Sequence, residues 1–207
     1  FSFHPVKIIT TGEGGMVTTN DKKLFSLLKI FRNHGVSRDL SIMKSKNNSK
    51  WYYEQLFLGY NYWTSDINAT LGISQLNRVS RFVKKRNLIA KTYNKFLKGL
   101  PIELPEVKKN NLSSHHLYII KLKENLKKHY NKIFKSLLAK KINVNLHYLP
   151  VHLHPFYKQK GFKKGNFPIS ELHASTAISI PIYYNLSKKN QLKIINIIKS
   201  ILKKHVF

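Results

Sequence analysis

A long central run of helical spacing constrains the fold of this chain more than any other feature. The run covers residues 65–97 and reads "SDINATLGISQLNRVSRFVKKRNLIAKTYNKFL". Apolar residues return every three or four positions, which predicts one long amphipathic helix that a break could interrupt. Asp66 stands at its start, where a carboxylate favours the positive end of the helix dipole. We therefore expect a connecting helix at residues 65–100, between an N-terminal part at 1–64 and a C-terminal part at 101–207.

The C-terminal part has the pattern of a small, self-contained α+β domain. Pro101 and Pro105 mark a linker at its start. Beyond them the spacing of apolar residues predicts five elements in this order: a strand at Leu117–Leu122, a helix at Tyr130–Lys141, a strand at Val144–Tyr148, a short helix at Glu171–Ala177 and a last helix at Ser187–Lys204. One apolar face of the last helix consists of Leu192, Ile195, Ile198, Ile201 and Leu202.

The first 64 residues have the pattern of the end of a larger domain. We predict a strand over residues 1–8, a glycine turn, a second strand at Met16–Thr19, and a helix that Asp21 caps and Gly35 ends. Two strands and a helix cannot bury their own apolar faces. Residues 36–58 are polar, aromatic and irregular, and a loop of this length is usually functional or disordered. We therefore expect residues 1–64 to be the C-terminal part of a large domain with a mobile loop.

Positive charge dominates the composition. The 207 residues include 37 Lys and Arg against 9 Asp and Glu, a formal net charge of +28. One interpretation is a basic nucleic-acid-binding module. We favour a lysine-rich surface instead, because the lysines are scattered through every segment and no zinc-finger spacing or aromatic RNA-binding motif is present. The absence of cysteine excludes disulfides and thiolate metal sites and fits a cytoplasmic protein.

One lysine stands in a context that suggests chemistry. Lys7 precedes the turn in "FSFHPVKIITTGEGGMVTTND". A lysine amine is nucleophilic only when neutral, and burial disfavours its charged form. Between Val6 and Ile8, Lys7 could be partly desolvated and could form a Schiff base with a carbonyl substrate or with pyridoxal phosphate. The alternative is a solvated surface lysine, and position alone does not decide between the two.

Several segments carry a family resemblance. The segment "SFHPVKIITTGEGGMVTTND" resembles the Schiff-base lysine segment of the DegT/DnrJ/EryC1/StrS family of sugar aminotransferases. Further blocks resemble family segments in the right order: "IFRNHG", "LGYNYWTSDINATLGISQL", "SSHHLYII", "INVNLHYLPVHLHPFY" and "GFKKGNFPISE". The resemblance implies an α/β fold, the fold-type I of pyridoxal-phosphate-dependent transferases such as aspartate aminotransferase. This chain would supply its C-terminal half: the end of the large-domain sheet and a small α+β domain.

The resemblance also implies roles for particular residues. Lys7 would hold the cofactor pyridoxal 5'-phosphate covalently and move a proton during transamination. Ser2 matches a serine that binds the cofactor phosphate, and Asn61 matches an asparagine that reaches the cofactor phosphate of the partner in a homodimer. Trp63 is a departure, because the family usually has arginine after "GYNY"; an indole cannot form the ion pair that arginine could. Ser65, where threonine is usual, is a milder departure.

The histidines and Glu13 are candidates for other chemistry. His152 and His154 have strand spacing for one face, but no Asp, Glu or Cys accompanies them between Glu124 and Glu171, and we predict no metal site. Under the resemblance this segment lines a nucleotide-sugar pocket, with substrate contacts from three residues: His116, His147 and Tyr148. The alternative is an aromatic loop packed on the small domain, with His116 a buried structural histidine. We expect His34 to cap the helix before Gly35, and Glu13 to serve the turn rather than act as the acid–base partner of Lys7.

The match to one branch of the family suggests a substrate. The "HPVK" form and the "HYLPVHLHPFY" block are most similar to the branch that acts on UDP-4-keto sugars in pseudaminic acid synthesis. The full enzyme would transfer an amino group, with glutamate the expected donor, to a UDP-linked 4-keto-6-deoxy-N-acetylhexosamine. Alternatives are a nucleotide-sugar aminotransferase of the perosamine, bacillosamine or aminoarabinose type, a non-catalytic relative, and the basic nucleic-acid-binding module.

The resemblance leaves part of a cofactor site unaccounted for. In the family an aspartate for the pyridine nitrogen, a residue that stacks on the ring and a glycine-threonine turn all lie upstream of the lysine, where this chain has six residues. We therefore expect a C-terminal fragment of an enzyme whose active sites are shared across a homodimer interface. By itself the 207-residue chain would be inactive.

Overall fold

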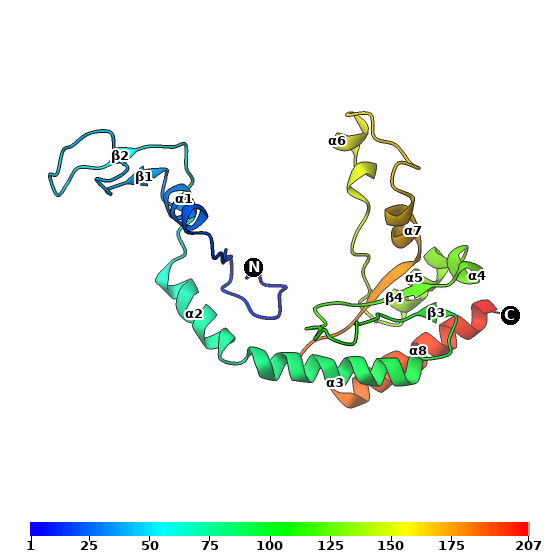
Figure 1. The fold of residues 1–207 in the computed structure, drawn as a ribbon. Coiled ribbons are helices and arrows are strands. Elements are labelled where there is room, and N and C mark those ends of the chain that lie inside the picture. Colours follow the sequence, from blue (N-terminus) through cyan, green and yellow to red (C-terminus); the bar gives the residue numbers. More distant parts are fainter. Residues whose placement is uncertain (207) are drawn as a thin grey trace. The chain divides into compact units, whose positions relative to one another are not determined.

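The structure, a computed structural model, describes residues 1–206 (Figure 1). The chain divides into two units, Phe1–Val79 and Ser80 onward, and each is described by itself. The first unit contains α1 (Lys22–Arg32), β1 (Val36–Ser37), β2 (Glu54–Gln55) and α2 (Asp66–Leu76). The second contains α3 (Val79–Leu97), β3 (Ile102–Glu103), β4 (Tyr118–Leu122), α4 (Glu124–Lys127), α5 (Tyr130–Ala139), η1 (Val151–Leu153), α6 (Pro155–Lys158), α7 (Pro168–Thr176), β5 (Ala177–Ile180) and α8 (Lys188–Val206).

The second unit is an antiparallel sheet covered by helices. Its strand order is β3-β4-β5, and Ile120 lies opposite Ile178 at the centre. α3 and α8 run beside each other in Figure 1, and the Gln191 side chain donates to the Ile89 carbonyl across that contact at 2.7 Å. Fully buried apolar side chains from β4, β5, α3, α5 and α8 form one core. The predicted strand and helices of this part are confirmed to within a few residues, including the buried face of α8.

One predicted strand of this unit is wrong. Residues 144–148 form no ladder, and only Asn145 makes an isolated antiparallel bridge, with Ser179 of β5. The side chain of Asn145 accepts a hydrogen bond from the N–H of Leu146 at 2.8 Å. Such a local bond from side chain to backbone competes with sheet pairing. The segment therefore touches the edge of the sheet once and then leaves it.

The first unit confirms the predicted helix and corrects the predicted strands. Asp21 accepts from the N–H groups of Lys23 and Leu24, as expected of an N-cap. Residues 1–8 form no strand: Ser2 makes an isolated bridge with Gly15, and the chain then turns where the Lys7 N–H donates to the His4 carbonyl. Proline within this stretch favours a turn and removes a backbone donor. Residues 16–19 likewise form no strand beyond the contacts of Met16 with Phe1.

The predicted long helix is interrupted between α2 and α3. The Arg78 N–H donates to the Gln75 carbonyl, three residues back, instead of to Ser74. The Arg78 side chain donates to the Ser74 carbonyl in its place, at 3.3 Å. The Arg78 side chain thus bonds to the Ser74 carbonyl, which the Arg78 N–H would have bonded in a continuous helix, and α2 ends before this point. The apolar face of α3 packs in the core of the second unit. The predicted division of the chain into residues 1–64, 65–100 and 101–207 stays a prediction.

Apolar burial differs sharply between the units. Within residues 1–79, all of which the structure describes, no apolar side chain is fully buried. Large side chains on both helices stay exposed, among them Phe25 on α1 and Ile67 on α2, which is 83% exposed. The helices of this unit therefore contribute no buried apolar core of their own. Among the described residues, no helix is both long enough and apolar enough to cross a membrane.

A close backbone crossing organises the first unit. Leu56 and Phe57 both donate their N–H groups to the Gly35 carbonyl, at 2.8 and 3.3 Å. A Cβ at Gly59 would lie 2.0 Å from the Gly35 nitrogen, and a Cβ at Gly35 would lie 1.8 Å from the Phe57 carbonyl oxygen. Gly35 also has φ +73°, a conformation that side chains disfavour. Only glycine at both positions allows the segment after β2 to cross the end of α1.

We expect Gly59→Ala to disrupt this crossing in the full-length protein. The added methyl group meets backbone, which cannot rotate away, so the variant should lose about 3 kcal/mol of stability or more. Gly12→Ala is the matched control, because Gly12 has φ +81° with nothing within 4 Å of the new Cβ; it should cost about 1–2 kcal/mol from backbone strain. Thermal unfolding and limited proteolysis within residues 38–58 measure both. Equal protection of the two variants would contradict the role of the crossing.

Candidate functional site

Lys7 lies in a closed loop rather than at the end of a strand. The Phe1 nitrogen donates to the Met16 carbonyl at 2.6 Å, and the Met16 N–H donates to the Phe1 carbonyl at 3.0 Å. The Phe3 carbonyl accepts from the N–H of Thr11 at 3.1 Å. These bonds close residues 1–16 into one loop, with Lys7 on its far side.

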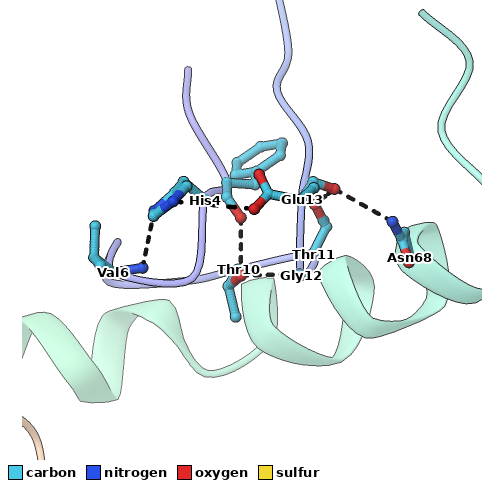
Figure 2. A network of polar contacts seen from close by, with 8 residues as sticks. His4, Val6, Thr10, Thr11, Gly12, Glu13 and Asn68 are labelled. Atoms are coloured by element: carbon cyan, nitrogen blue, oxygen red, sulfur yellow. Dashed lines mark hydrogen bonds and ion pairs between the residues drawn. The ribbon is translucent and has the colours of Figure 1, made fainter.

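Threonines and an asparagine hold the loop in shape, as Figure 2 shows. The Thr10 hydroxyl donates to the Phe3 carbonyl at 2.8 Å and accepts from the Gly12 N–H at 2.9 Å. The Thr11 hydroxyl donates to the Glu13 carbonyl at 2.7 Å, and the Asn68 side chain donates to the same carbonyl at 3.3 Å. The first turn of α2 is therefore hydrogen-bonded to the glycine turn that follows Lys7.

α2 also packs closely on the loop. Thr11 is buried, and a Cβ at Gly72 would lie 2.7 Å from its methyl carbon. The roles of Asn68 and Gly72 were missed in the sequence. A glycine within a helical pattern was the available signal, since such glycines often mark close packing.

The Lys7 amine has no polar partner in the part of the chain that the structure describes. Lys7 is half-buried, and its amine makes no hydrogen bond or ion pair with any of residues 1–206. The Glu13 carboxylate lies beside His4 instead, at 4.0 Å from the imidazole nitrogen, and its backbone carbonyl serves the turn. This agrees with the expectation that Glu13 is a turn residue.

The other predicted cofactor residues lie on the same unit. Ser2 is exposed on the loop, where it bridges Gly15. Asn61 follows the glycine crossing and pairs with Asn33 at the end of α1. No contact among residues 1–79 joins Asn61 to Lys7, and the two assignments stay predictions.

The departure at Trp63 has a structural explanation. The indole N–H of Trp63 donates to the Asn33 side-chain oxygen at 3.0 Å, and the Arg32 guanidinium lies 4.2 Å from the centre of the indole ring.

The structure places His34 beyond the helix, with φ +55° and its N–H bonded to the Tyr60 carbonyl, while Asn33 is the C-cap. His34 thus continues the turn after α1, and the expectation that it caps the helix is wrong.

In the second unit, His116 lies beside a buried arginine. Arg86 of α3 donates from one nitrogen to the carbonyls of His115, His116 and Ile182, at 3.0, 3.2 and 3.1 Å. These bonds fix the backbone just before β4 against the chain that leaves β5. Burial and the Arg86 charge lower the pKa of His115, which is buried, whereas His116 is half-buried. A substrate role for His116 stays a prediction.

His147 and Tyr148 lie where the chain leaves the sheet edge. The His147 ring is 2.7 Å from the Ser179 hydroxyl of β5, and its carbonyl faces the ring of His173 at 3.2 Å. Burial lowers the pKa of His147, which favours the neutral imidazole. Tyr148 is 72% exposed and free to meet a ligand. The structure shows no contact that assigns either residue to a substrate.

His152 and His154 separate instead of sharing one face. His152 is buried in η1 and lies 2.9 Å from the Glu171 carboxylate of α7, whereas His154 is exposed before α6. Glu171 also accepts from the Gly165 N–H at 2.7 Å, and hydrogen bonding to His152 lowers its pKa. Glu171 thus ties the histidine segment and the loop at Gly165 to α7. Within residues 1–206 no three His, Asp or Glu side chains form a metal-binding group.

Glu171→Ala should loosen this segment. Loss of the carboxylate leaves a buried imidazole and the Gly165 N–H without their acceptor, so we expect the melting temperature to fall by roughly 3–8 °C. Glu124→Ala removes a carboxylate from an exposed ion pair with Lys127 and should lower the melting temperature by less than about 2 °C. Thermal unfolding followed by circular dichroism compares the two. Equal shifts would show that Glu171 is a surface charge only.

His115 should make stability depend on pH. Its pKa is lowered in the folded state, so the unfolded chain binds the proton more readily, and stability falls as pH drops below about 6.5. His115→Asn removes the titrating group and keeps a residue that tolerates the positive φ of 45°. Urea unfolding at pH 7.5 and 5.5 should show a smaller loss in this variant than in the wild type. His154→Asn, at an exposed site, should lose as much stability between the two pH values as the wild type does.

Comparison with known proteins places this geometry in a family. The model of the DegT/DnrJ/EryC1/StrS aminotransferase family matches residues 1–199. An uncharacterised protein of Methanocaldococcus jannaschii is 40% identical over 97% of the chain and 53% of its own length. The UDP-4-amino-4,6-dideoxy-N-acetyl-beta-L-altrosamine transaminase of Campylobacter jejuni serotype O:23/36 is 36% identical over 99% of the chain and 52% of its own length.

Solved structures agree with the sequence matches. The Helicobacter pylori aminotransferase PseC, involved in the biosynthesis of pseudaminic acid, superposes with a TM-score of 0.88 at 29% identity, over 99% of this chain and 53% of that one. A sugar aminotransferase of Streptococcus pneumoniae, solved in its PMP and PLP forms, gives 0.86 and 0.85 at 28% identity, over all of this chain and about half of its own. The chain thus spans about half the length of the relatives it matches and has the α/β fold of these enzymes. It belongs to the DegT/DnrJ/EryC1/StrS aminotransferase family, whose members use pyridoxal phosphate.

Proposed function

We propose that this chain is part of an aminotransferase that acts on a nucleotide-linked keto sugar, with pyridoxal phosphate as its cofactor. The observation that carries the proposal is the unpartnered amine of Lys7, on a braced loop within a chain that matches the family over residues 1–199. A loop fixed by Thr10, Thr11 and Asn68 can hold an amine at one position while a substrate reacts beside it.

The residues of the first unit fit the cofactor. Lys7 would bind its aldehyde carbon through the side-chain amine, Ser2 would donate to its phosphate, and Asn61 would reach the phosphate of the cofactor that the partner of a homodimer holds. When bound, the cofactor supplies a ring that takes up the electrons released at the amino-acid carbon. The role of the protein is then to orient the reactants and to move one proton, which the Lys7 amine can accept and return.

The proposed substrate is a UDP-linked 4-keto-6-deoxy-N-acetylhexosamine, with glutamate as the amino donor. The names of the Campylobacter and Helicobacter relatives support this choice, and several of them are altrosamine transaminases. The GDP-perosamine synthase of Vibrio cholerae, 29% identical over 97% of this chain, keeps a perosamine-type reaction as the second candidate. In the second unit His116, His147 and Tyr148 would contact the nucleotide sugar. Mass spectrometry of the products from a panel of keto sugars separates the two candidates.

The exposed apolar faces of the first unit support a homodimer. Neither α1 nor α2 buries a single residue completely, and aromatic side chains around the glycine crossing are also exposed. Covering such faces with a second copy and with further sheet would provide the burial that this unit lacks. We expect residues 1–207 alone to bind pyridoxal phosphate weakly and to be inactive. The absence of cysteine fits a cytoplasmic location for the enzyme.

Borohydride trapping in the full-length protein tests the proposal. Reduction should fix the cofactor on Lys7, which peptide mapping locates. Lys7→Ala should abolish the label and lower the activity at least about 1,000-fold, since it removes the nucleophile and the proton carrier together. Lys23→Ala, on exposed α1, should leave both unchanged. A label on another lysine would refute the assignment. Tight, steeply salt-dependent binding to DNA without any label would favour the nucleic-acid-binding alternative.

A further inference from the structure

The imidazole of His147 is anchored to the sheet through β5. Asn145 and Ser179 exchange two backbone hydrogen bonds, at 3.2 and 2.8 Å, where the segment touches the sheet edge. Two residues further along, Nδ1 of His147 lies 2.7 Å from the Ser179 hydroxyl oxygen. The serine side chain therefore contacts the ring exactly where the chain begins to leave the sheet.

Two further contacts hold His147 in place. The His147 carbonyl can only accept a hydrogen bond, so the ring of His173 in α7 donates to it from Nε2, at 3.2 Å. The ring of Tyr148 packs against the His147 ring in a T-shaped arrangement, with centroids 4.7 Å apart and 80° between the planes. Backbone and ring of His147 are thus both restrained, by partners on α7, on β5 and in the same segment.

The hydrogen bond to Ser179 fixes the tautomer of His147. Ser179 is 6% exposed, and its hydroxyl makes no other hydrogen bond with residues 1–206. A hydroxyl proton enclosed without an acceptor costs free energy, so the serine donates and Nδ1 accepts. In a neutral imidazole whose Nδ1 accepts, the proton is on Nε2.

The surroundings of His147 favour that neutral ring. Burial lowers its pKa, and none of the ion pairs within residues 1–206 brings a carboxylate to it. Its Nε2 atom makes no hydrogen bond with the same residues, and it is not enclosed by protein. His147 therefore offers one neutral N–H donor, fixed in position and open to solvent.

We propose that Ser179 and His173 are positioning residues, which present the Nε2–H of His147 to the sugar part of the substrate. A neutral donor suits a neutral acceptor, such as a hydroxyl, keto or amide oxygen, whereas a phosphate is bound more strongly by a charged donor. A donor that is oriented beforehand loses less entropy when the ligand arrives. The choice of a sugar ligand rests on the proposed function; the fixed tautomer rests on the contacts of Ser179 alone.

Nitrogen NMR of the full-length protein with labelled histidine tests the tautomer. The wild-type spectrum at pH 7.5 should show His147 protonated at Nε2, and His147→Gln identifies its signals by their loss. Ser179→Ala removes the donor to Nδ1 and should give a mixture of both tautomers. Ser179→Thr keeps a hydroxyl and should restore the wild-type pattern. Circular dichroism verifies that each variant is folded.

Steady-state kinetics of the full-length enzyme tests the role in binding. Ser179→Ala should raise the KM for the keto sugar about three- to tenfold. The KM for glutamate and the inhibition constant of UDP should not change, because neither ligand contains the sugar. His173→Ala should act in the same direction, since it removes the donor to the His147 carbonyl. Ser175→Ala is the matched control: that hydroxyl bonds to the Leu172 carbonyl within α7, and its loss should leave every constant unchanged.

Substitution of His147 itself distinguishes its two nitrogens. The amide nitrogen of Gln reaches about as far as Nε2, whereas that of Asn reaches only about as far as Nδ1. His147→Gln should therefore keep a lower KM for the sugar than His147→Asn. A glutamine donates without help from a serine, so Ser179→Ala should change the KM by less than about twofold in the His147→Gln background.

Three results would overturn the proposal. A His147 ring protonated at Nδ1 in the wild type would reject the assigned tautomer. An unchanged KM for the sugar in Ser179→Ala would reject the positioning role. An equal rise in the inhibition constant of UDP would show that the variant disturbs the whole binding region and not one donor to the sugar. If the enzyme converts no keto sugar, the proposed function fails, and the NMR spectra still decide whether Ser179 fixes His147.

Discussion

The architecture of the first unit depends on two backbones that cross at a distance only glycine permits. Gly35 and Gly59 remove the side chains at this point, so the strand-like segment after β2 can lie directly against the end of α1. The crossing sets the register in which Asn61 meets Asn33 and brings Trp63 over Arg32. Backbone contacts place Asn33 and Asn61 on that surface, and side-chain contacts with Asn33 and Trp63 then place Trp63 and Arg32. A unit without buried apolar side chains needs such a constraint.

The two units solve the folding problem differently. The second buries Tyr93, Tyr118 and many aliphatic side chains, and two of the polar groups it encloses bond to backbone: Arg86 donates to three carbonyls, and Tyr93 donates to the Pro181 carbonyl at 2.8 Å. The first has a comparable supply of large apolar residues, and they remain on its surface. Its helices were predictable from spacing and from the Asp21 cap, because those signals are local. Whether their apolar faces are buried depends on tertiary packing, which local signals do not describe.

The errors of the sequence analysis share a physical cause. Strands were predicted at residues 1–8 and 144–148 from their apolar composition, but a turn at Pro5 and the side chain of Asn145 provide local hydrogen bonding that replaces a ladder. The pairing of His152 with Glu171 was missed because it spans 19 positions, and spacing along the chain gives no measure of such a contact. Lys7, by contrast, was identified through the resemblance of a whole segment. Its sequence neighbours left partial burial and a solvated surface position both open, and they gave no sign of the closed loop in which the structure places a half-buried Lys7.

The net positive charge of this molecule does not by itself select one anion over another. A net charge of +28 raises the local concentration of any phosphate-bearing ligand, yet charge spread over every segment selects none of them. Selection needs donors at fixed positions, which net charge alone does not provide. Arg86 is fixed, but three backbone carbonyls use its donors. Arg32 is held by an indole face that leaves its donors free. In a lysine-rich protein the informative cation is therefore the one whose geometry is fixed by a neighbour that does not neutralise it.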